Sequence, residues 1–396
     1  MNPDLEKLQS YPFQKLNSLL EGATPNSDYS PIALYIGEPR HPTPEFIKQS
    51  LIDNLAGMAS YPATAGIPEL RAAIARWLQN RYQVSMDPQT QIIPVNGSRE
   101  ALFAFAQAVI DPRLPDPVVI CPNPFYQIYE GAALLGRATP YFLNSFAENR
   151  YAASFSDLPD SVWQRTQLIF TCSPGNPTGA VMPLAQWKAL FELSDKYGFI
   201  IASDECYSEI YFHEGQPPLG ALDAARQLGR HDFKRLVMFS SLSKRSNVPG
   251  MRSGFVAGDA EIIRKYLLYR TYHGCAMSGP VQVASAAAWG DEKHVVENRR
   301  LYLEKFDVAL SILQPVCDVT LPDAAFYLWL PTTISDTEFA RRLYIDKNVT
   351  VLPGSYLARQ AQGVNPGTNR VRVALVSSME ECSESARRIR DFIVKL

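Results

Sequence analysis

The fold prediction rests on residues 236–244, which read LVMFSSLSK. Leu236 to Phe239 are apolar on both faces, which is typical of a strand buried in a parallel sheet. The polar residues that follow end in Lys244. Lysine is strongly hydrated and seldom lies in such a place for packing alone. A desolvated lysine loses its proton more readily and can form a Schiff base with an aldehyde.

Similar apolar runs occur earlier in the chain, at Val118–Cys121, Leu168–Phe170 and Phe199–Ala202. Helical patterns separate them. One of these covers Leu184 to Tyr197 and is followed by Gly198, a residue suited to a helix C-cap. This alternation predicts an α/β fold, with a mostly parallel central sheet flanked by helices on both faces.

The pattern changes after about residue 285. A helical stretch at 297–312 precedes two strand patterns, at 325–330 and 370–375, and an amphipathic helix at 379–396 closes the chain. These elements predict a smaller α+β domain. We therefore expect an N-terminal arm that joins the small domain at 1–45, a large domain at 46–284 and the small C-terminal domain at 285–396.

The composition of the 396 residues favours a small-molecule partner. The formal net charge of -2 provides no basic field for nucleic acid or a membrane surface. Six cysteines are scattered without a Cys-x-x-Cys pair, and no spacing suggests a metal site. The sequence has no apolar signal core and no apolar stretch of membrane-spanning length. We expect a cytoplasmic protein with reduced thiols.

Polar residues follow three of the predicted strands. In open parallel sheets, ligands bind beyond the carboxyl ends of the strands. Residues 173–179 read SPGNPTG and display Asn176 on a rigid turn, although a plain turn is the simpler interpretation. Asp204 and Tyr207 follow the next strand. A buried acid there needs a compensating cation, unless Asp204 merely caps a helix.

Two further segments suit an anion. Arg252 lies in the small-residue turn 249–254, and a guanidinium binds phosphate in bidentate fashion. Residues 95–100 form a polar turn before a helical run at 101–110, where free backbone N–H groups favour an anion or simply mark a capped helix. The Ser-x-x-Lys spacing of Ser241 and Lys244 also occurs in β-lactamase-type hydrolases, but their Ser-Asp-Asn and Lys-Thr-Gly partner motifs are absent.

Taken together, these motifs resemble those of the class I and II aminotransferases of fold type I, which use pyridoxal 5′-phosphate (PLP). The resemblance extends from Gly37 to Arg372 and implies a PLP-binding large domain. It implies that Lys244 binds PLP covalently and moves a proton between the substrate Cα and the cofactor C4′. Asp204 would pair with the pyridine nitrogen. Tyr207 and Asn176 would hydrogen-bond the ring O3′, and Lys244, Asp204 and Tyr207 form the expected catalytic set.

The resemblance also assigns the remaining site residues. Tyr126 would stack on the ring, and Tyr61 would reach the phosphate of a neighbouring subunit in a homodimer with composite sites. Arg372 would bind the substrate α-carboxylate with Gly37 and Asn176 nearby. Tyr126 and Tyr61 could also be ordinary half-buried aromatics, and Arg372 a surface charge. The expected phosphate-binding residues are Gly97, Ser98, Arg99, Ser241, Ser243 and Arg252.

Two segments resemble those of the bacterial N-succinyl-diaminopimelate aminotransferases, namely 245–247 and 37–42. This implies transamination between N-succinyl-LL-2,6-diaminopimelate and 2-oxoglutarate, giving N-succinyl-2-amino-6-oxopimelate and glutamate, in lysine and diaminopimelate biosynthesis. Arg40, Arg99 and Arg245 are candidate cations for the extra carboxylates of that substrate, although each could be structural.

Three alternatives stay open at this point. The chain could be an aspartate- or alanine-type aminotransferase, or a PLP-dependent C–S lyase that uses the same lysine and aspartate. It could also be a PLP sensor without enzymatic activity. Sensors of that kind need a fused DNA-binding module, and the stretch before Gly37 leaves little room for one.

Overall fold

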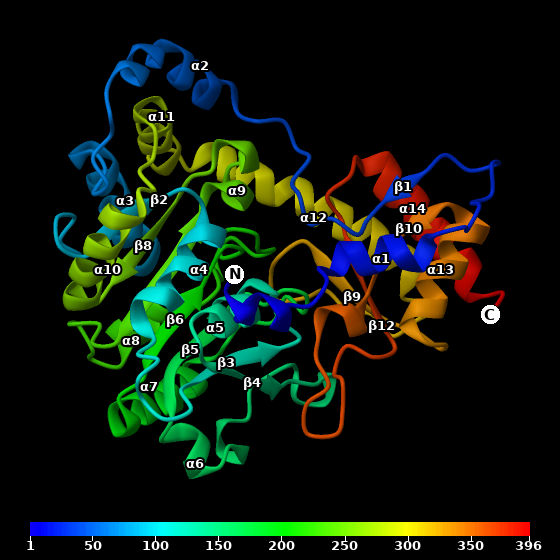
Figure 1. Ribbon diagram of the computed structural model, residues 1–396. Helices are drawn as coiled ribbons and strands as arrows, with labels where there is room; N and C mark the ends of the chain where they lie inside the picture. Colours follow the sequence, from blue (N-terminus) through cyan, green and yellow to red (C-terminus); the bar gives the residue numbers. More distant parts are fainter.

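The computed structural model describes residues 1–396, apart from the side chain of Asp157. Its central element is a seven-stranded sheet with the order β2-β8-β7-β6-β5-β3-β4 (Figure 1). The strands are β2 (Ile92–Val95), β3 (Val118–Asn123), β4 (Thr139–Asn144), β5 (Thr166–Cys172), β6 (Ile200–Asp204), β7 (Leu236–Ser241) and β8 (Gly254–Gly258).

The strand directions confirm the prediction of a mostly parallel sheet. Neighbours from β7 through β6, β5 and β3 to β4 pair in parallel, whereas β8 runs antiparallel to both β2 and β7. The four predicted apolar runs lie in β3, β5, β6 and β7. Since these strands are parallel, their carboxyl ends lie at one edge of the sheet, and the polar residues that follow them meet there.

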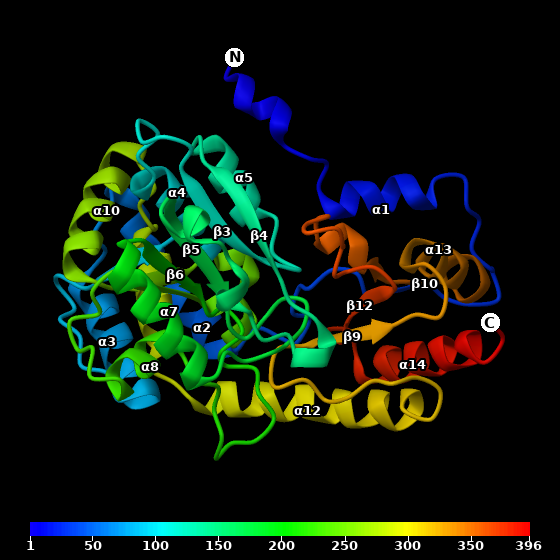
Figure 2. The same cartoon turned by 90° about the horizontal axis from the view of Figure 1, so that it is seen from below.

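Helices cover both faces of the sheet (Figure 2). Alternate strand residues enter two apolar clusters: Val237 and Phe239 join one face, while Leu236 and Met238 join the other. This arrangement explains why the strands are apolar along their whole length. The first face packs against α4 (Ser98–Val109), α5 (Ile128–Leu135) and α10 (Ala260–His273). The second packs against α3 (Pro68–Tyr82), α7 (Leu184–Tyr197), α8 (Ala221–Gln227) and α11 (Gly279–Trp289).

The C-terminal part has its own antiparallel sheet, with the order β11-β12-β9, and its own apolar cluster. The N-terminal arm joins it, because β1 (Ile32–Ala33) pairs with β10 (Val349–Thr350). The domain boundaries at 45 and 284 stay a prediction, and the cluster of the large sheet extends past the second boundary to Trp289. The other elements of this part are α1 (Pro12–Leu20), α12 (Lys293–Leu313), β9 (Tyr327–Pro331), α13 (Asp336–Lys347), β11 (Leu352–Pro353), β12 (Arg370–Ala374) and α14 (Met379–Ile393).

Short helical elements complete the chain. Helix α2 (Glu45–Asp53) packs against α11, and α9 follows β7 directly. None of the described helices is both long and apolar enough to cross a membrane. The short elements are α6 (Asp160–Trp163), α9 (Leu242–Arg245), η1 (Pro3–Lys7), η2 (Leu55–Ala59), η3 (Ala147–Asn149), η4 (Phe155–Asp157), η5 (Pro249–Met251) and η6 (Gly354–Leu357).

The predicted element bounds differ from the observed ones where backbone geometry intervenes. Helix α7 ends as predicted, because Gly198 adopts the left-handed conformation at φ 83°. The strand predicted from residue 325 begins instead at Tyr327. Ala325 has φ 69°, and this left-handed conformation is incompatible with an extended strand.

A buried ion pair joins the large sheet to the C-terminal part. Arg359 donates to both carboxylate oxygens of Glu130 on α5, at 2.9 and 2.6 Å. The backbone of Arg359 also exchanges hydrogen bonds with the Asn123 side chain at the end of β3. These contacts fix the C-terminal part beside the carboxyl ends of the strands.

Candidate active site

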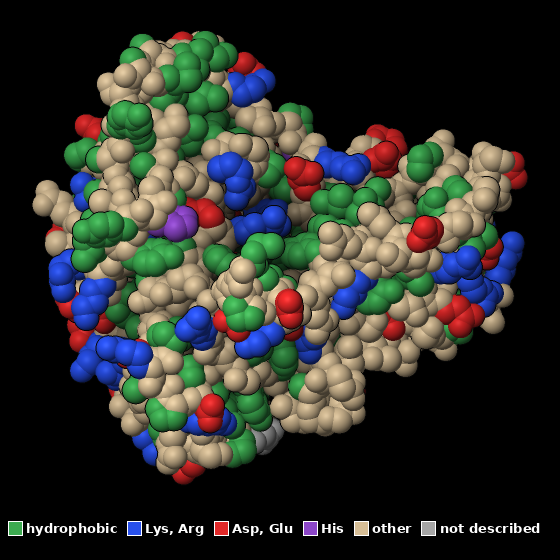
Figure 3. Space-filling view, in the orientation of Figure 1, with side chains coloured by type: hydrophobic (Ala, Val, Ile, Leu, Met, Phe, Trp, Pro, Cys, Tyr) green, Lys and Arg blue, Asp and Glu red, His purple; other side chains and the backbone are tan. Residues whose placement is uncertain are grey.

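A cavity of about 530 Å³ lies at the carboxyl ends of β5, β6 and β7. The large sheet supplies Asp204 and the Lys244 segment, and the C-terminal part supplies Tyr327 and Arg372. Figure 3 shows the surface hollowed between these two parts, with Lys or Arg side chains inside the hollow. The cavity therefore forms only because the two parts of the chain meet.

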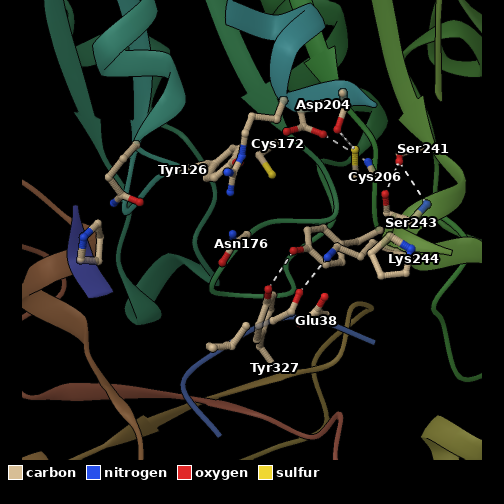
Figure 4. Close-up of a pocket in the computed structure, with 18 of the residues that line it drawn as sticks. Glu38, Tyr126, Cys172, Asn176, Asp204, Cys206, Ser241, Ser243, Lys244 and Tyr327 are labelled. Atoms are coloured by element: carbon tan, nitrogen blue, oxygen red, sulfur yellow. Dashed lines mark hydrogen bonds between the residues drawn. The ribbon is translucent and has the colours of Figure 1, made fainter. Parts of the chain in front are cut away.

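The amine of Lys244 points into this cavity (Figure 4). Helix α9 places it there, beginning directly after β7 with Ser241 as the N-cap. The Lys244 Nζ donates to the Gly37 carbonyl oxygen at 2.7 Å. Burial, together with the nearby guanidiniums of Arg372 and Arg252, lowers the pKa of Lys244 to about 8, while Cys206 and Glu38 oppose the change. A substantial fraction of this amine is therefore neutral near pH 8 and able to act as a nucleophile or base.

Asp204 lies buried at the end of β6. Its carboxylate accepts from the Tyr129 hydroxyl at 2.7 Å and from the Cys206 backbone N–H at 3.3 Å. Burial raises the pKa of Asp204, while the hydrogen bonds from Tyr129 and Cys206 and the charge of Lys244 lower it. No described helix begins at Asp204, so the helix-cap alternative is wrong. A buried carboxylate with spare acceptor capacity fits the protonated ring nitrogen of a pyridine.

The start of α4 and the turn at 249–252 form a cradle that fits a phosphate. Gly97, at φ 84°, caps α4, and a Cβ atom there would lie 2.3 Å from the Arg252 Nη2. The backbone conformation at φ 84° favours glycine at this position, and a Cβ atom would require the guanidinium to move. Free N–H groups at a helix N-terminus and a guanidinium are two recurrent phosphate ligands.

Three serines lie around this cradle. The Ser98 hydroxyl accepts from the Cys206 thiol at 2.9 Å. The Ser241 hydroxyl donates to the Ser253 carbonyl at 3.0 Å, and its oxygen lies 2.9 Å from the Ser243 hydroxyl oxygen. Ser98, Ser241 and Ser243 all line the cavity, as predicted for phosphate-binding residues, although their contacts to a phosphate stay a prediction.

Arg372 lines the cavity together with Lys244. Its guanidinium donates to the Asn176 side-chain oxygen at 2.9 Å and to the Tyr35 carbonyl at 2.8 Å. It lies 4.5 Å from the ring centre of Tyr327. Arg372 is only 4% exposed, so the alternative of a surface charge is wrong. A buried guanidinium with polar neighbours fits a substrate carboxylate.

Tyr327 lines the cavity beside Arg372 and contacts Tyr207. Its hydroxyl lies 2.8 Å from that of Tyr207. A Cβ atom on Gly37 would lie 1.9 Å from the Tyr327 hydroxyl oxygen, so glycine is required at position 37. The Gly37 backbone can thus approach both Lys244 and the cavity, in agreement with its predicted position in the site.

Tyr126 and Arg99 lie at the cavity wall and contact each other. The Arg99 Nε donates to the Tyr126 hydroxyl at 2.6 Å, and its guanidinium lies over the ring of Tyr11. Arg99 was expected to offer a backbone or side-chain donor to the phosphate, which stays a prediction. In the structure its side chain holds Tyr126, which lines the cavity.

Four predicted positions do not line the cavity: Gly97, which directly precedes the lining residue Ser98, and Tyr61, Arg245 and Arg40. Tyr61 is fully exposed and lies outside the cavity of its own chain, so its role toward a neighbouring subunit stays a prediction. For Arg245, a candidate cation that could also be structural, the structural alternative holds: it is buried beside Trp289 and paired with Glu292. Arg40 donates to Ser377 and does not line the cavity.

Several cavity residues were not predicted from the sequence. Cys206 lies between Asp204 and Tyr207 in the sequence, so its position within that motif was a usable signal. Glu38 likewise follows Gly37 directly. Nothing in the sequence alone connects Tyr327 or Tyr11 with this cavity, because both reach it through tertiary packing.

Comparison with known proteins identifies the family. The family model described as aminotransferase class I and II matches residues 30–389. The LL-diaminopimelate aminotransferase of Aquifex aeolicus is 30% identical, with 91% of each chain covered. That of Nitratidesulfovibrio vulgaris is 31% identical, with 90% of each covered.

Solved structures agree with this likeness. An aminotransferase from Neisseria meningitidis is 52% identical with a TM-score of 0.96, covering 99% of this chain and 100% of the other. The aminotransferase AspB of Helicobacter pylori is 34% identical with a TM-score of 0.91, covering 98% and 100%.

The predicted N-succinyl substrate is wrong, because the curated relatives are named for LL-diaminopimelate, which carries no succinyl group. The burial of Arg245 agrees with this correction, since it removes one of the cations proposed for the extra carboxylates. The matched family model and the cavity geometry together show that this chain belongs to the class I and II aminotransferases, which are PLP-dependent enzymes acting on amino and 2-oxo acids.

Proposed function

We propose that this chain transaminates LL-diaminopimelate directly, with a 2-oxo acid as the acceptor. The observation that carries the proposal is the cavity in which the Lys244 amine, the Asp204 carboxylate and the Arg372 guanidinium converge. The names of the curated relatives support the substrate. The far end of LL-diaminopimelate carries an ammonium and a carboxylate, and the cavity offers Glu38 and Arg99 as partners of opposite charge.

The residues of the site fit PLP. Lys244 would bind its aldehyde carbon, Asp204 its ring nitrogen, and Gly97, Ser241 and Arg252 its phosphate. When bound, the ring accepts the electron pair that remains after the substrate loses its Cα proton.

The chain's own groups then perform binding and proton transfer. Arg372, held by Asn176, binds the substrate α-carboxylate and orients the Cα–H bond toward Lys244. Freed Lys244 removes the proton from Cα and later returns a proton, for which a pKa near neutrality is suited. The Asp204 carboxylate would stabilise the positive charge on the protonated ring nitrogen of PLP. Burial of these groups strengthens each electrostatic contact.

We also propose a homodimer with composite sites. Large apolar side chains are exposed on η2 and α10, among them Met58, Tyr272 and Leu268. Exposed apolar groups of this kind commonly mark protein interfaces. Tyr61, which is equally exposed, would extend into the partner's phosphate site. The six free cysteines support a reducing compartment, and we propose the cytoplasm.

Substituting Lys244→Ala should abolish transamination, since no other group at this position can bind the aldehyde and carry the Cα proton. Borohydride reduction of the parent holoenzyme followed by peptide mapping should label Lys244. The matched control is Lys188→Ala on the surface of α7, which should retain full activity. A label on a different lysine would refute the proposed site.

Cofactor uptake should depend on pH through Lys244. Its neutral form is the nucleophile, and that form increases as pH rises through the pKa, so the uptake rate should inflect near pH 8 instead of near 10.5. Glu38 raises this pKa, so Glu38→Gln should shift the inflection to lower pH, whereas Glu21→Gln on the surface should not. Stopped-flow absorbance of the apoenzyme mixed with PLP measures the rate. An inflection near pH 10 in the parent protein would contradict the assigned burial.

Single half-reactions with different amino donors test the substrate. LL-diaminopimelate should have a higher kcat/KM than aspartate or alanine. Glu38→Gln should reduce kcat/KM for LL-diaminopimelate about tenfold, the equivalent of one charge-assisted hydrogen bond, and change that for alanine much less. Equal or faster turnover of aspartate or alanine would instead support the aspartate- or alanine-type reaction, which the likeness to the Helicobacter AspB structure favours.

Sedimentation analysis tests the dimer. The holoenzyme should have twice the 44.2 kDa mass of one chain. Tyr61→Ala should weaken PLP retention without changing the fold of the single chain, because the side chain is free of packing there. A purely monomeric holoenzyme with full activity would exclude composite sites.

A further inference from the structure

A chain of polar side chains connects α12 to the backbone of Lys244. The Asn298 Nδ2 donates to the Lys244 carbonyl oxygen at 3.3 Å. The Asn298 Oδ1 lies 2.7 Å from His41 Nδ1 and accepts from Asn247 Nδ2 at 3.0 Å. His41 Nε2 lies 2.6 Å from the Lys305 Nζ. None of these side chains is among the described residues that line the cavity, so they act behind the site.

The donors and acceptors fix the direction of each hydrogen bond in this network of side chains. The Lys244 carbonyl only accepts, so the Asn298 amide must present its nitrogen there and its oxygen to His41. His41 must then carry a proton on Nδ1, and as a neutral ring it accepts on Nε2 from the Lys305 ammonium. The contacts of Asn298 and His41 are therefore satisfied in a single arrangement.

The burial of the Lys305 ammonium at this position is energetically unfavourable. It is 3% exposed, and it forms no ion pair with any carboxylate in the described part of the chain. Besides His41, its ammonium faces the ring of Tyr302 at 5.2 Å. Burial lowers the pKa values of both Lys305 and His41. Burying a cation without a counter-charge opposes folding, so packing alone does not account for this arrangement.

The contact to Lys244 meets a specific structural need. Helix α9 has only four residues, Leu242–Arg245, so the Lys244 carbonyl lies in the last turn and has no partner within the helix. Asn298 supplies that partner from outside. A rotation of this peptide group would displace the whole lysine side chain and its amine, and misplacement of a reacting group by about 1 Å can cost about a hundredfold in rate.

We propose that Asn298 is a positioning residue for Lys244, and that His41 and Lys305 hold Asn298 in the required orientation. The proposal rests on the function proposed above, in which Lys244 binds PLP and moves the Cα proton. It adds residues from α12 and from the segment after Gly37 that act on the reaction through the lysine backbone, without touching substrate or cofactor.

The test compares two Asn→Asp substitutions. Asn298→Asp keeps the shape of the side chain but removes the amide donor to the Lys244 carbonyl. Asn348→Asp is the matched control, because the buried Asn348 likewise donates its Nδ2 to a backbone carbonyl, that of Tyr29 at 2.7 Å. Asn298→Asp should lower kcat about tenfold to a hundredfold with little change in KM. It should also shift the pH at which the absorbance of the bound cofactor changes, and the control should do neither.

Two substitutions of His41 make the test independent of any folding defect at Asn298. His41→Asn keeps a donor nitrogen at the place of Nδ1, facing the Asn298 oxygen. This variant should therefore retain most of the parent kcat and absorbance profile. His41→Leu removes that donor and should behave like Asn298→Asp. Thermal melting of the apoproteins shows how much each change affects the fold.

Two results would overturn the proposal. In the first, Asn298→Asp and His41→Leu keep kcat and the absorbance midpoint of the parent. In the second, Asn348→Asp loses activity to the same extent, which would mean a general loss of stability. A parent holoenzyme without a borohydride label on Lys244 would instead refute the proposed function, so the two failures are distinguishable.

Discussion

The desolvation of one amine is the constraint on which the site depends. Lys244 lies at the end of a buried strand, and water cannot solvate its charge there. The Lys244 amine donates one hydrogen bond to the Gly37 carbonyl. Burial and the surrounding cations lower the pKa of Lys244 to about 8, so that part of the amine is neutral near physiological pH. Moving this amine into water would restore an ordinary, protonated lysine, which is a poor nucleophile. The burial of Lys244 in the cavity therefore determines how much of its amine is neutral and reactive.

Two separate parts of the chain create that depth. The parallel register aligns Cys172 with Asp204, and Asp204 with Phe239, so one wall follows directly from strand pairing. The opposite wall depends on docking of the C-terminal part. Its strand β12 carries Arg372, and a backbone hydrogen bond from Ala374 to Leu34 brings the segment before Gly37 alongside. Neither part alone encloses the Lys244 amine.

This division explains what the sequence could and could not predict. Strands β3, β5, β6 and β7 were predictable because they are buried on both faces, and residues such as Asp204 follow them directly. Tyr327 was not, because its place opposite Tyr207 depends on how the second sheet docks. The two alternatives for Arg245, a substrate cation or a structural residue, could not be separated from the sequence. Its position against Trp77 and Trp289 depends on the packing of α3 and α11, which local sequence does not report.

The wrong substrate was inferred from similarity in the segments 37–42 and 245–247, and no residue of the second segment is among the described residues that line the cavity. The residues after Lys244 contact the region around the start of α12: Arg245 pairs with Glu292, Ser246 bonds to His294, and Asn247 bonds to Asn298. Farther along, α12 packs against α14 in the C-terminal part that carries Arg372. One helix thus contacts the Lys244 segment from behind and packs against the part of the chain that carries Arg372. Similarity in the segment 245–247 consequently reports a shared scaffold for the lysine, and a substrate cannot be inferred from residues that face away from it.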